Sequence, residues 1–272
     1  MKLIHIINSN NKSDFKAAID ELGIQYDYEE SIVGKWVHFE IAESDPHWPA
    51  VERLVDIHNL GSHTIRSEFT KAEKEKADFL RLFYAWENGY PLPDDDFGYL
   101  HMTYNLPEFC KKCDIGKQQK APFRMKSEPK WGRRHIMKFF WVEDEFFVRP
   151  EVWHDVFKPF GIGCRPVVKH RDGEELQTVV QLDIAQTSPS PLCLDGYPTE
   201  TCEDCGKSKV QPGIQGFFPK FAEPPEGDMF KAQEWFGSGG SAYRPVFISN
   251  RLYLALEEKK IKGAVYHPVA NE

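Results

Sequence analysis

The chain has 272 residues, with 34 lysine or arginine and 42 aspartate or glutamate residues, so its formal net charge is −8. This length can bury a large core, and the 14% of aromatic residues argue against a disordered chain. No stretch approaches the roughly 18 apolar residues of a membrane-spanning helix. The negative charge argues against binding nucleic acid with the whole surface. The N-terminal sequence turns polar too early for a secretory signal, so we expect a cytoplasmic protein.

Residues 1–69 predict a small unit in which strands and helices alternate. Apolar residues follow strand-like and helix-like spacings in turn, in the order βαββαβ. Strands are expected at 3–7, 24–28, 37–41 and 63–69, and helices at 14–22 and 51–58. This order is typical of a ferredoxin-like fold, in which both helices cover one face of the sheet. Many unrelated functions occur on that fold, so it does not indicate an activity.

A linking segment is expected next. Residues 71–86 combine a charged first half with apolar residues at helical spacing, which predicts a linking helix. The run 89–96 is rich in proline and aspartate and cannot continue a helix. We therefore predict a linking helix and loop over 70–97 and an α+β domain over 98–272.

Two segments of this domain resemble each other at an offset of 100 residues. Residues 146–163 and 246–263 each predict a strand, a helix of about ten residues and a glycine that stops it, Gly163 or Gly263. A further strand is expected after each glycine. The few identities fit a strand–helix–strand pseudo-repeat and a chance likeness of two such units about equally well. Between the copies, 178–184 predicts another strand.

Two CxxC pairs are the most informative residues of the chain. Cys110 and Cys113 form the first pair, and Cys202 and Cys205 form the second, which is followed by Gly206. A CxxC turn brings two sulfurs to one side of a tight loop, and two such turns provide the four thiolates of a structural Zn²⁺ site. Four cysteine ligands leave no coordination position for water or substrate, so we expect a structural and not a catalytic ion. The ion would hold together two hairpins that are distant in sequence.

Redox chemistry and disulfides are the alternatives to zinc. A thioredoxin-like redox pair would leave the second CxxC unexplained, and disulfides are disfavoured in the cytoplasm. Cys164 and Cys193 stand beside apolar residues, and we expect them to be buried neutral thiols. The HExxH, GxGxxG and GxSxG patterns are all missing from the sequence, so we predict no catalytic residues and no enzymatic activity.

A basic segment offers a second functional hypothesis. Residues 117–138 carry eight basic residues and one acid, Glu128, in a chain that is otherwise strongly acidic. Phe123 and Trp131 lie among them and would suit base stacking beside phosphate contacts, as in a nucleic-acid-associated zinc protein. A solvated loop or a site for an acidic protein partner would explain the same residues. The candidates for contact with an anionic partner are Lys117, Lys120, Arg124, Lys126, Lys130, Arg133, Arg134 and Lys138.

Residues from about 98 to 269 resemble the bacterial double-CxxCG-motif proteins. The likeness rests on the two cysteine pairs, on Gly206, and on the strand–helix segments 146–164 and 246–269. Asp114 stands where the family has a glycine after the first pair, and residues 1–69 lie outside the pattern. Members of that family look like immunity proteins of polymorphic-toxin systems, which neutralise a cognate toxin by binding it. The resemblance implies a non-enzymatic binding protein whose partner is a toxin.

Overall fold

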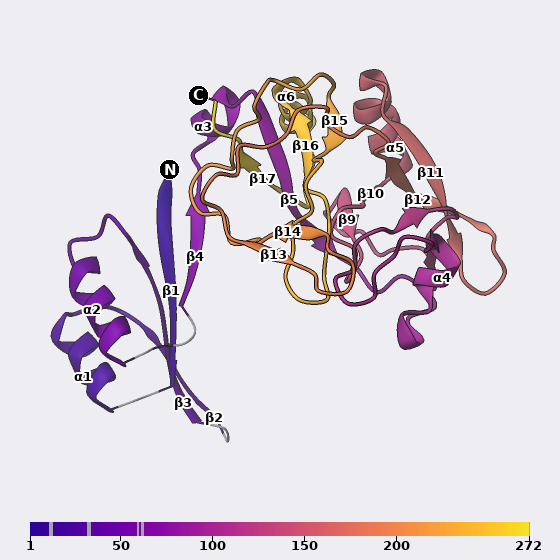
Figure 1. Ribbon diagram of the computed structural model, residues 1–272. Coiled ribbons are helices and arrows are strands. Elements are labelled where there is room, and N and C mark those ends of the chain that lie inside the picture. Colours follow the sequence, from indigo (N-terminus) through magenta and orange to yellow (C-terminus); the bar gives the residue numbers. More distant parts are fainter. Residues whose placement is uncertain (11–12, 32–33, 59, 61–62, 272) are drawn as a thin grey trace. The chain divides into compact units, whose positions relative to one another are not determined.

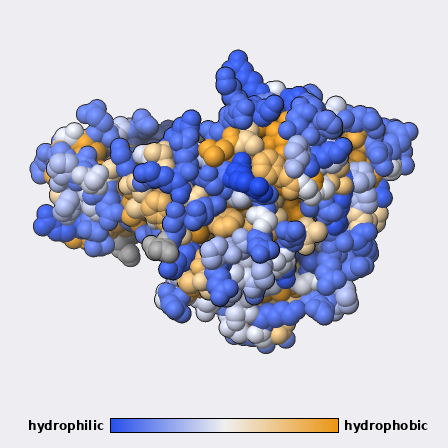
Figure 2. Space-filling model, turned by 90° about the horizontal axis from the view of Figure 1, so that it is seen from above, coloured by the Kyte–Doolittle hydropathy of each residue, from blue (hydrophilic) through white to orange (hydrophobic). Residues whose placement is uncertain are grey.

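The computed structural model describes residues 1–10, 13–31, 34–58, 60 and 63–271 (Figure 1). The protein is a mixed α+β protein with more sheet than helix. It divides into a first unit, Met1–Glu73 with Gln215–Phe217, and a second unit, Lys74–Ile214 with Phe218–Glu272. In the view of Figure 2, hydrophilic residues cover most of the surface and apolar residues show as smaller areas among them. Among the described helices, none has the length and apolar character needed to cross a bilayer.

The first unit is a four-stranded antiparallel sheet with two helices. Its elements are β1 (Lys2–Asn10), α1 (Ser13–Glu21), β2 (Asp27–Ser31), β3 (Gly34–Ala42), α2 (Trp48–His58) and β4 (His63–Glu68). The six predicted elements are therefore present in the predicted order, but the strand predicted at 24–28 begins at Asp27, three residues later than predicted. The strands pair in the order β2-β3-β1-β4. Both helices lie on the same side of this sheet (Figure 1).

Alternation along the strands builds the core of the first unit. Every second residue of β3 from Val37 to Ile41 is buried, and Phe39 pairs with the buried Ile7 of β1. Apolar residues spaced three and four apart on the helices meet this face. The buried members of this core are Ile7, Phe15, Ile19, Val37, Phe39, Ile41, Trp48, Val51 and Val55.

The segment predicted as a linking helix is a short helix followed by a strand. Helix α3 (Lys71–Lys76) ends early, and β5 (Phe79–Glu87) follows it. The prediction of a helix up to Trp86 was therefore wrong beyond Lys76. Strand β5 lies inside the sheet of the second unit and pairs with β16, β17 and β9. A strand enclosed in this way has a nearly continuous apolar sequence, which cannot be told from a buried helix by spacing alone.

The main sheet of the second unit combines strands from most of its length. The strands besides β5 are β8 (Arg124–Met125), β9 (Ile136–Lys138), β10 (Phe147–Val148), β11 (Gly163–Lys169), β12 (Glu175–Asp183), β15 (Met229–Lys231), β16 (Val246–Ser249) and β17 (Ala264–Pro268). They pair in the order β15-β16-β5-β9-β10-β12-β11-β8, with β17 also on β5. Strand β12 confirms the strand predicted at 178–184.

Each of the two similar segments has a helical stretch between two strands, but the stretches differ. Between β10 and β11 lie α5 (Pro150–Val152), a π-helical turn (Trp153–Phe157) and a 3₁₀ turn (Lys158–Phe160). Between β16 and β17 lies the regular helix α6 (Asn250–Glu258).

The predicted stop glycines act differently from the prediction. The first helical stretch ends at Gly161, whose φ of +75° is left-handed, and Gly163 already belongs to β11. Gly263 follows α6 by several residues, and a Cβ there would lie 2.5 Å from the carbonyl oxygen of Ile136. Glycine is therefore required at 263 because two backbone segments approach closely.

Candidate metal centre

Short antiparallel hairpins carry both cysteine turns. Strands β6 (Tyr104–Asn105) and β7 (Gln118–Gln119) pair on either side of the first turn. Strands β13 (Thr199–Thr201) and β14 (Ser208–Val210) pair on either side of the second. Both hairpins belong to the second unit.

Backbone hydrogen bonds close the second turn in a definite way. The N–H of Cys202 donates to the carbonyl oxygen of Lys207 at 2.9 Å, and the N–H of Gly206 donates to the carbonyl oxygen of Cys202 at 2.9 Å. Gly206 has a φ of +70°. This left-handed conformation turns the chain back after the second cysteine, and glycine adopts it without steric cost.

The first turn repeats the same pattern although it has no glycine at that position. The N–H of Cys110 donates to the carbonyl oxygen of Ile115 at 2.9 Å, and the N–H of Asp114 donates to the carbonyl oxygen of Cys110 at 2.8 Å. Asp114 has a φ of +66°. Aspartate is among the residues that tolerate this region best, so it takes the place of the glycine.

The side chain of Asp114 fixes its own position. Its Oδ2 accepts a hydrogen bond from Nζ of Lys117 at 2.6 Å and a longer one from the N–H of Ala242 at 3.4 Å. Burial raises the pKa of Asp114, and the charge of Lys117 opposes this effect. Lys117, one of the basic residues considered as a partner contact, is therefore engaged within the fold.

The four cysteine sulfurs of the two turns come together. All four Sγ atoms lie within 4.8 Å of one another. The Sγ of Cys110 lies 3.7 Å from that of Cys202, and the Sγ of Cys113 lies 3.6 Å from that of Cys205. A disulfide would need about 2.05 Å. These are separate thiols in an arrangement that can hold a metal ion.

The four thiols differ in their surroundings. Cys113 and Cys202 are buried, and the other two are more accessible. Hydrogen bonds from the backbone N–H groups of Cys113 and Lys112 lower the pKa of Cys110 to about 7, whereas burial raises the pKa of Cys113 to about 12. Metal binding would therefore release protons from this cluster, because the thiolate is the ligand.

Charged side chains also join the two turns. Nζ of Lys112 in the first turn lies 2.9 Å from Glu203 and 3.2 Å from Asp204 in the second. Lys207 lies 3.8 Å from Glu108. These ion pairs are exposed to solvent, so they contribute little to the free energy of unfolding. Their main effect is to favour the correct alignment of one turn against the other.

A loop at 237–242 covers the cluster. Ala242 packs against the buried cysteines and Ile115. The buried side chain of Lys209, in β14, donates hydrogen bonds to the carbonyl oxygens of Gly239 and Ser241. A Cβ at Gly237 would lie 2.1 Å from the carbonyl oxygen of Ser241, so this tight loop requires glycine. The second hairpin therefore fixes the loop.

The basic segment is part of the fold as well as of the surface. Phe123 is 0% exposed and Trp131 is 5% exposed, and the indole N–H of Trp131 donates to the carbonyl oxygen of Thr178. The expectation that these two rings stack on bases was therefore wrong, because β8 and β9 place the segment within the main sheet. The exposed basic residues are Lys120, Lys126, Lys130, Arg133 and Arg134, and Arg124 is half-buried.

One further basic residue and the two remaining cysteines have different surroundings from those expected. Lys138 is buried and forms ion pairs with Glu143 and Glu87. Cys193 is exposed, so the prediction of a buried thiol was wrong there. Cys164 is half-buried in β11, and burial raises its pKa.

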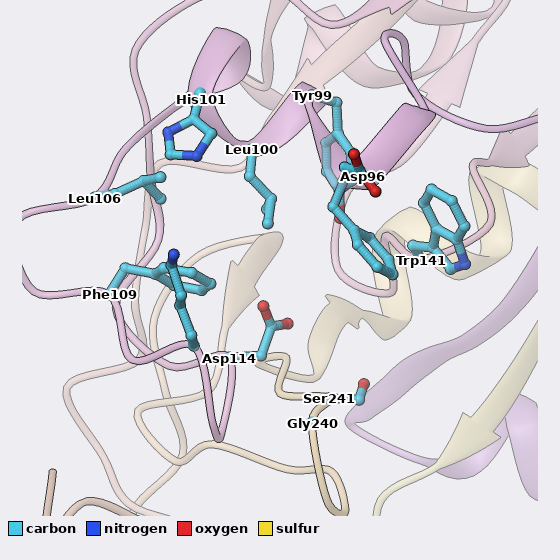
Figure 3. Close-up of a pocket in the computed structure, with 12 residues that line it drawn as sticks. Asp96, Tyr99, Leu100, His101, Leu106, Phe109, Asp114, Trp141, Gly240 and Ser241 are labelled. Atoms are coloured by element: carbon cyan, nitrogen blue, oxygen red, sulfur yellow. The ribbon is translucent and has the colours of Figure 1, made fainter. Parts of the chain in front are cut away.

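Sequence reasoning missed a cavity of about 490 Å³ beside the first cysteine turn (Figure 3). Phe97, Tyr99 and Trp141 line it together with Asp96 and Asp114. The proline- and aspartate-rich run at 89–96 was the one local signal, because it predicted an irregular segment where the cavity begins.

Comparisons with protein-family models, with curated proteins and with solved structures found no match to the chain.

Proposed function

We propose that this chain is a non-enzymatic binding protein whose second unit is held together by a structural zinc ion. The observation that carries the proposal is the convergence of four cysteine sulfurs from two turns that residues 114–201 separate. Zinc–sulfur bonds of about 2.3 Å in a tetrahedron place neighbouring sulfurs about 3.8 Å apart. The Cys110–Cys202 and Cys113–Cys205 sulfurs, at 3.7 and 3.6 Å, lie close to that spacing.

The ligand set favours a structural role. Four thiolates in a tetrahedral arrangement suit zinc or iron and leave no open position for water or substrate. A bound ion would close a long chain segment between the turns, so its binding free energy would add to the folding free energy. The ion would therefore stabilise the second unit.

Metal analysis of the purified chain tests this part of the proposal. We expect about one zinc ion per chain, and its loss in Cys110→Ser and in Cys205→Ser. Cys193→Ser is the matched control, because Cys193 is an exposed cysteine outside the cluster, and this variant should retain zinc. A purified chain that holds no metal and is fully folded would contradict the proposal.

We further infer, from the likeness to the double-CxxCG-motif proteins, an immunity-type role in the cytoplasm with a toxin as the protein partner. Two observations support this inference. The cysteine pairs of that motif converge, and the net charge of −8 would speed the capture of a basic toxin. Co-purification with the product of a neighbouring gene tests it, and a gene neighbourhood without any toxin-like reading frame would count against it.

We also propose two finer features of the fold. We interpret the first unit as ferredoxin-like, because a βαββαβ order with strand order β2-β3-β1-β4 is the arrangement expected of that fold. We interpret β10–β11 and β16–β17 as copies of a strand–helix–strand pseudo-repeat. Their shared order supports this interpretation, although the helical stretch is regular in one copy alone.

A further inference from the structure

The cavity beside the first cysteine turn has aromatic walls and two carboxylates, those of Asp96 and Asp114, in its lining. In Figure 3, Leu100 and Asp114 point into the space between Phe109 on one side and Trp141 on the other. The lining comes from four parts of the second unit: the segment 96–106, the first cysteine turn at 109–114, Trp141, and the covering loop at 240–241.

Backbone strain concentrates at this cavity. In the described parts of the chain, five non-glycine residues have left-handed backbone, and Asp96, Phe97, Asp114 and Trp141, four of the five, line this cavity. A left-handed conformation is unusual for a bulky aromatic residue and persists where the surrounding structure imposes it. Such residues cluster at binding and active sites.

The aromatic side chains gain little from burial in return for this strain. Phe97 is 50% exposed and Trp141 is 40% exposed. Their ring centroids lie 4.6 Å apart, and the Trp141 ring stacks on Tyr99 at 6.1 Å. An exposed aromatic cluster that the core does not require marks a contact site for another molecule.

The charge of the cavity indicates what that molecule carries. The carboxylates of Asp96 and Asp114 line it, and Asp94 and Asp95 directly precede Asp96. Lys111 lines the cavity as an opposing charge. Asp114 is already paired with Lys117 at 2.6 Å, so Asp96 is the acid that we expect to meet a cation. Aromatic faces beside carboxylates attract cations, and a planar guanidinium can stack on a ring while it bonds to a carboxylate.

We propose that this cavity is the docking site for an arginine side chain on a basic segment of a protein partner. The inference rests on the proposed partner-binding function and adds the surface and its chemistry. Phe109, Lys111 and Asp114 belong to the first cysteine turn, and Lys209 ties the loop at 240–241 to the second hairpin. A metal ion between the turns would therefore fix the cavity walls before the partner arrives, which favours tight binding.

Peptide binding to the full, zinc-loaded chain tests the site. The probe is a fluorescein-labelled peptide of four Gly-Arg repeats, followed by fluorescence anisotropy at 150 mM salt, with Gly-Lys and Gly-Glu repeats beside it. We expect the arginine peptide to bind at least about fivefold more tightly than the lysine peptide. We expect Phe97→Gly or Asp96→Asn to weaken its binding at least about tenfold. Glycine adopts the left-handed backbone of Phe97 freely, so this variant should stay folded.

Matched controls separate the site from general charge and folding effects. Phe83 is also 50% exposed and lies outside the cavity, and Asp195 is an exposed acid outside it. Phe83→Ala and Asp195→Asn should bind the arginine peptide like the wild type. Equal weakening by these controls, or no binding by the zinc-loaded wild type, would overturn the site.

Two further measurements keep this inference distinct from the proposed function. Zinc content is measured on every sample, so a loss of binding through loss of metal is recognised. A partner that co-purifies equally well with Phe97→Gly would overturn the cavity as its docking site and leave the binding function intact. If a single-stranded oligonucleotide binds the wild type but not Phe97→Gly, the cavity is a nucleic-acid site. That result would overturn the proposal of a protein partner at the cavity.

Discussion

The two cysteine turns reach one backbone geometry with different residues. Gly206 in the second turn and Asp114 in the first both have left-handed backbone, with φ of +70° and +66°. Both donate their N–H to the carbonyl oxygen of the first cysteine of their turn. The turn therefore requires a conformation and a donor, and glycine is one way to provide them. At Asp114, the hydrogen bonds that its carboxylate accepts from Lys117 and Ala242 offset the free-energy cost of the left-handed conformation.

Breaking the shared cluster should have the largest effect, and an equal one from either side. If both turns hold one ion, Cys110→Ser and Cys205→Ser should each destabilise the chain by on the order of 5 kcal/mol or more, because structural zinc binding supplies about 10–16 kcal/mol in zinc-finger peptides. The double variant should lose little more than either single one. Urea unfolding followed by tryptophan fluorescence measures this, and Trp235 beside the cluster is a suitable reporter.

Cys193 is an exposed cysteine outside the cluster and provides the control. Cys193→Ser should leave the unfolding midpoint within error of the wild type. If a chelator removes all metal without shifting the midpoint of urea unfolding, the two turns are held together without an ion. Unequal losses from the two turns would show that they do not share one ligand sphere.

Exchanging the turn residues should have the next largest effect. A Cβ at Gly206 meets nothing within 4 Å, so Gly206→Ala should cost only the left-handed backbone penalty of about 1–2 kcal/mol. Gly206→Asp should cost less, because aspartate tolerates this region better than alanine. Chemical denaturation of the zinc-loaded variants measures both. A larger loss for aspartate than for alanine would contradict the equivalence of the two turns.

This equivalence shows how far the sequence predicted the metal centre. The spacing of Cys110, Cys113, Cys202 and Cys205 predicted the four ligands, because two sulfurs on one turn follow from local geometry alone. The first turn was the weaker signal, since Asp114 adopts its left-handed backbone with the help of Lys117 and Ala242. A contact such as Ala242 depends on the fold of a distant loop, which local sequence does not contain.

The rest of the fold also divides into features that local sequence determines and features that depend on tertiary contacts. The elements of the first unit follow from alternation and helical spacing, because one face of its sheet is packed against helices. Strand β5 could not be predicted, since it is enclosed by other strands and its apolar run fits both periods. The cavity was missed for a related reason. The left-handed backbone of Phe97 and Trp141 is imposed by tertiary structure, and the spacing of residue types in the sequence does not predict it.

Removing the carboxylate of Asp114 should lower the free energy of unfolding by less than Gly206→Ala does. Asp114→Gly relieves the left-handed backbone but removes the partner of Lys117, whose side chain is 12% exposed. The gain and the loss oppose each other, so we expect a net destabilisation of about 1 kcal/mol. Asp114→Asn keeps an acceptor and should fall between glycine and the wild type. A clear stabilisation by glycine would show that the carboxylate bonds do not offset the strain.

The ion pairs between the turns should matter least. Lys112 meets Glu203 and Asp204 at the surface, where solvent and salt screen the charges. Lys112→Ala should therefore shift the thermal midpoint by less than about 2 °C at low salt and by nothing measurable at 1 M salt. Zinc content should stay at the wild-type level. A large, salt-independent shift would mean that this lysine, and not the metal, holds the first turn against the second.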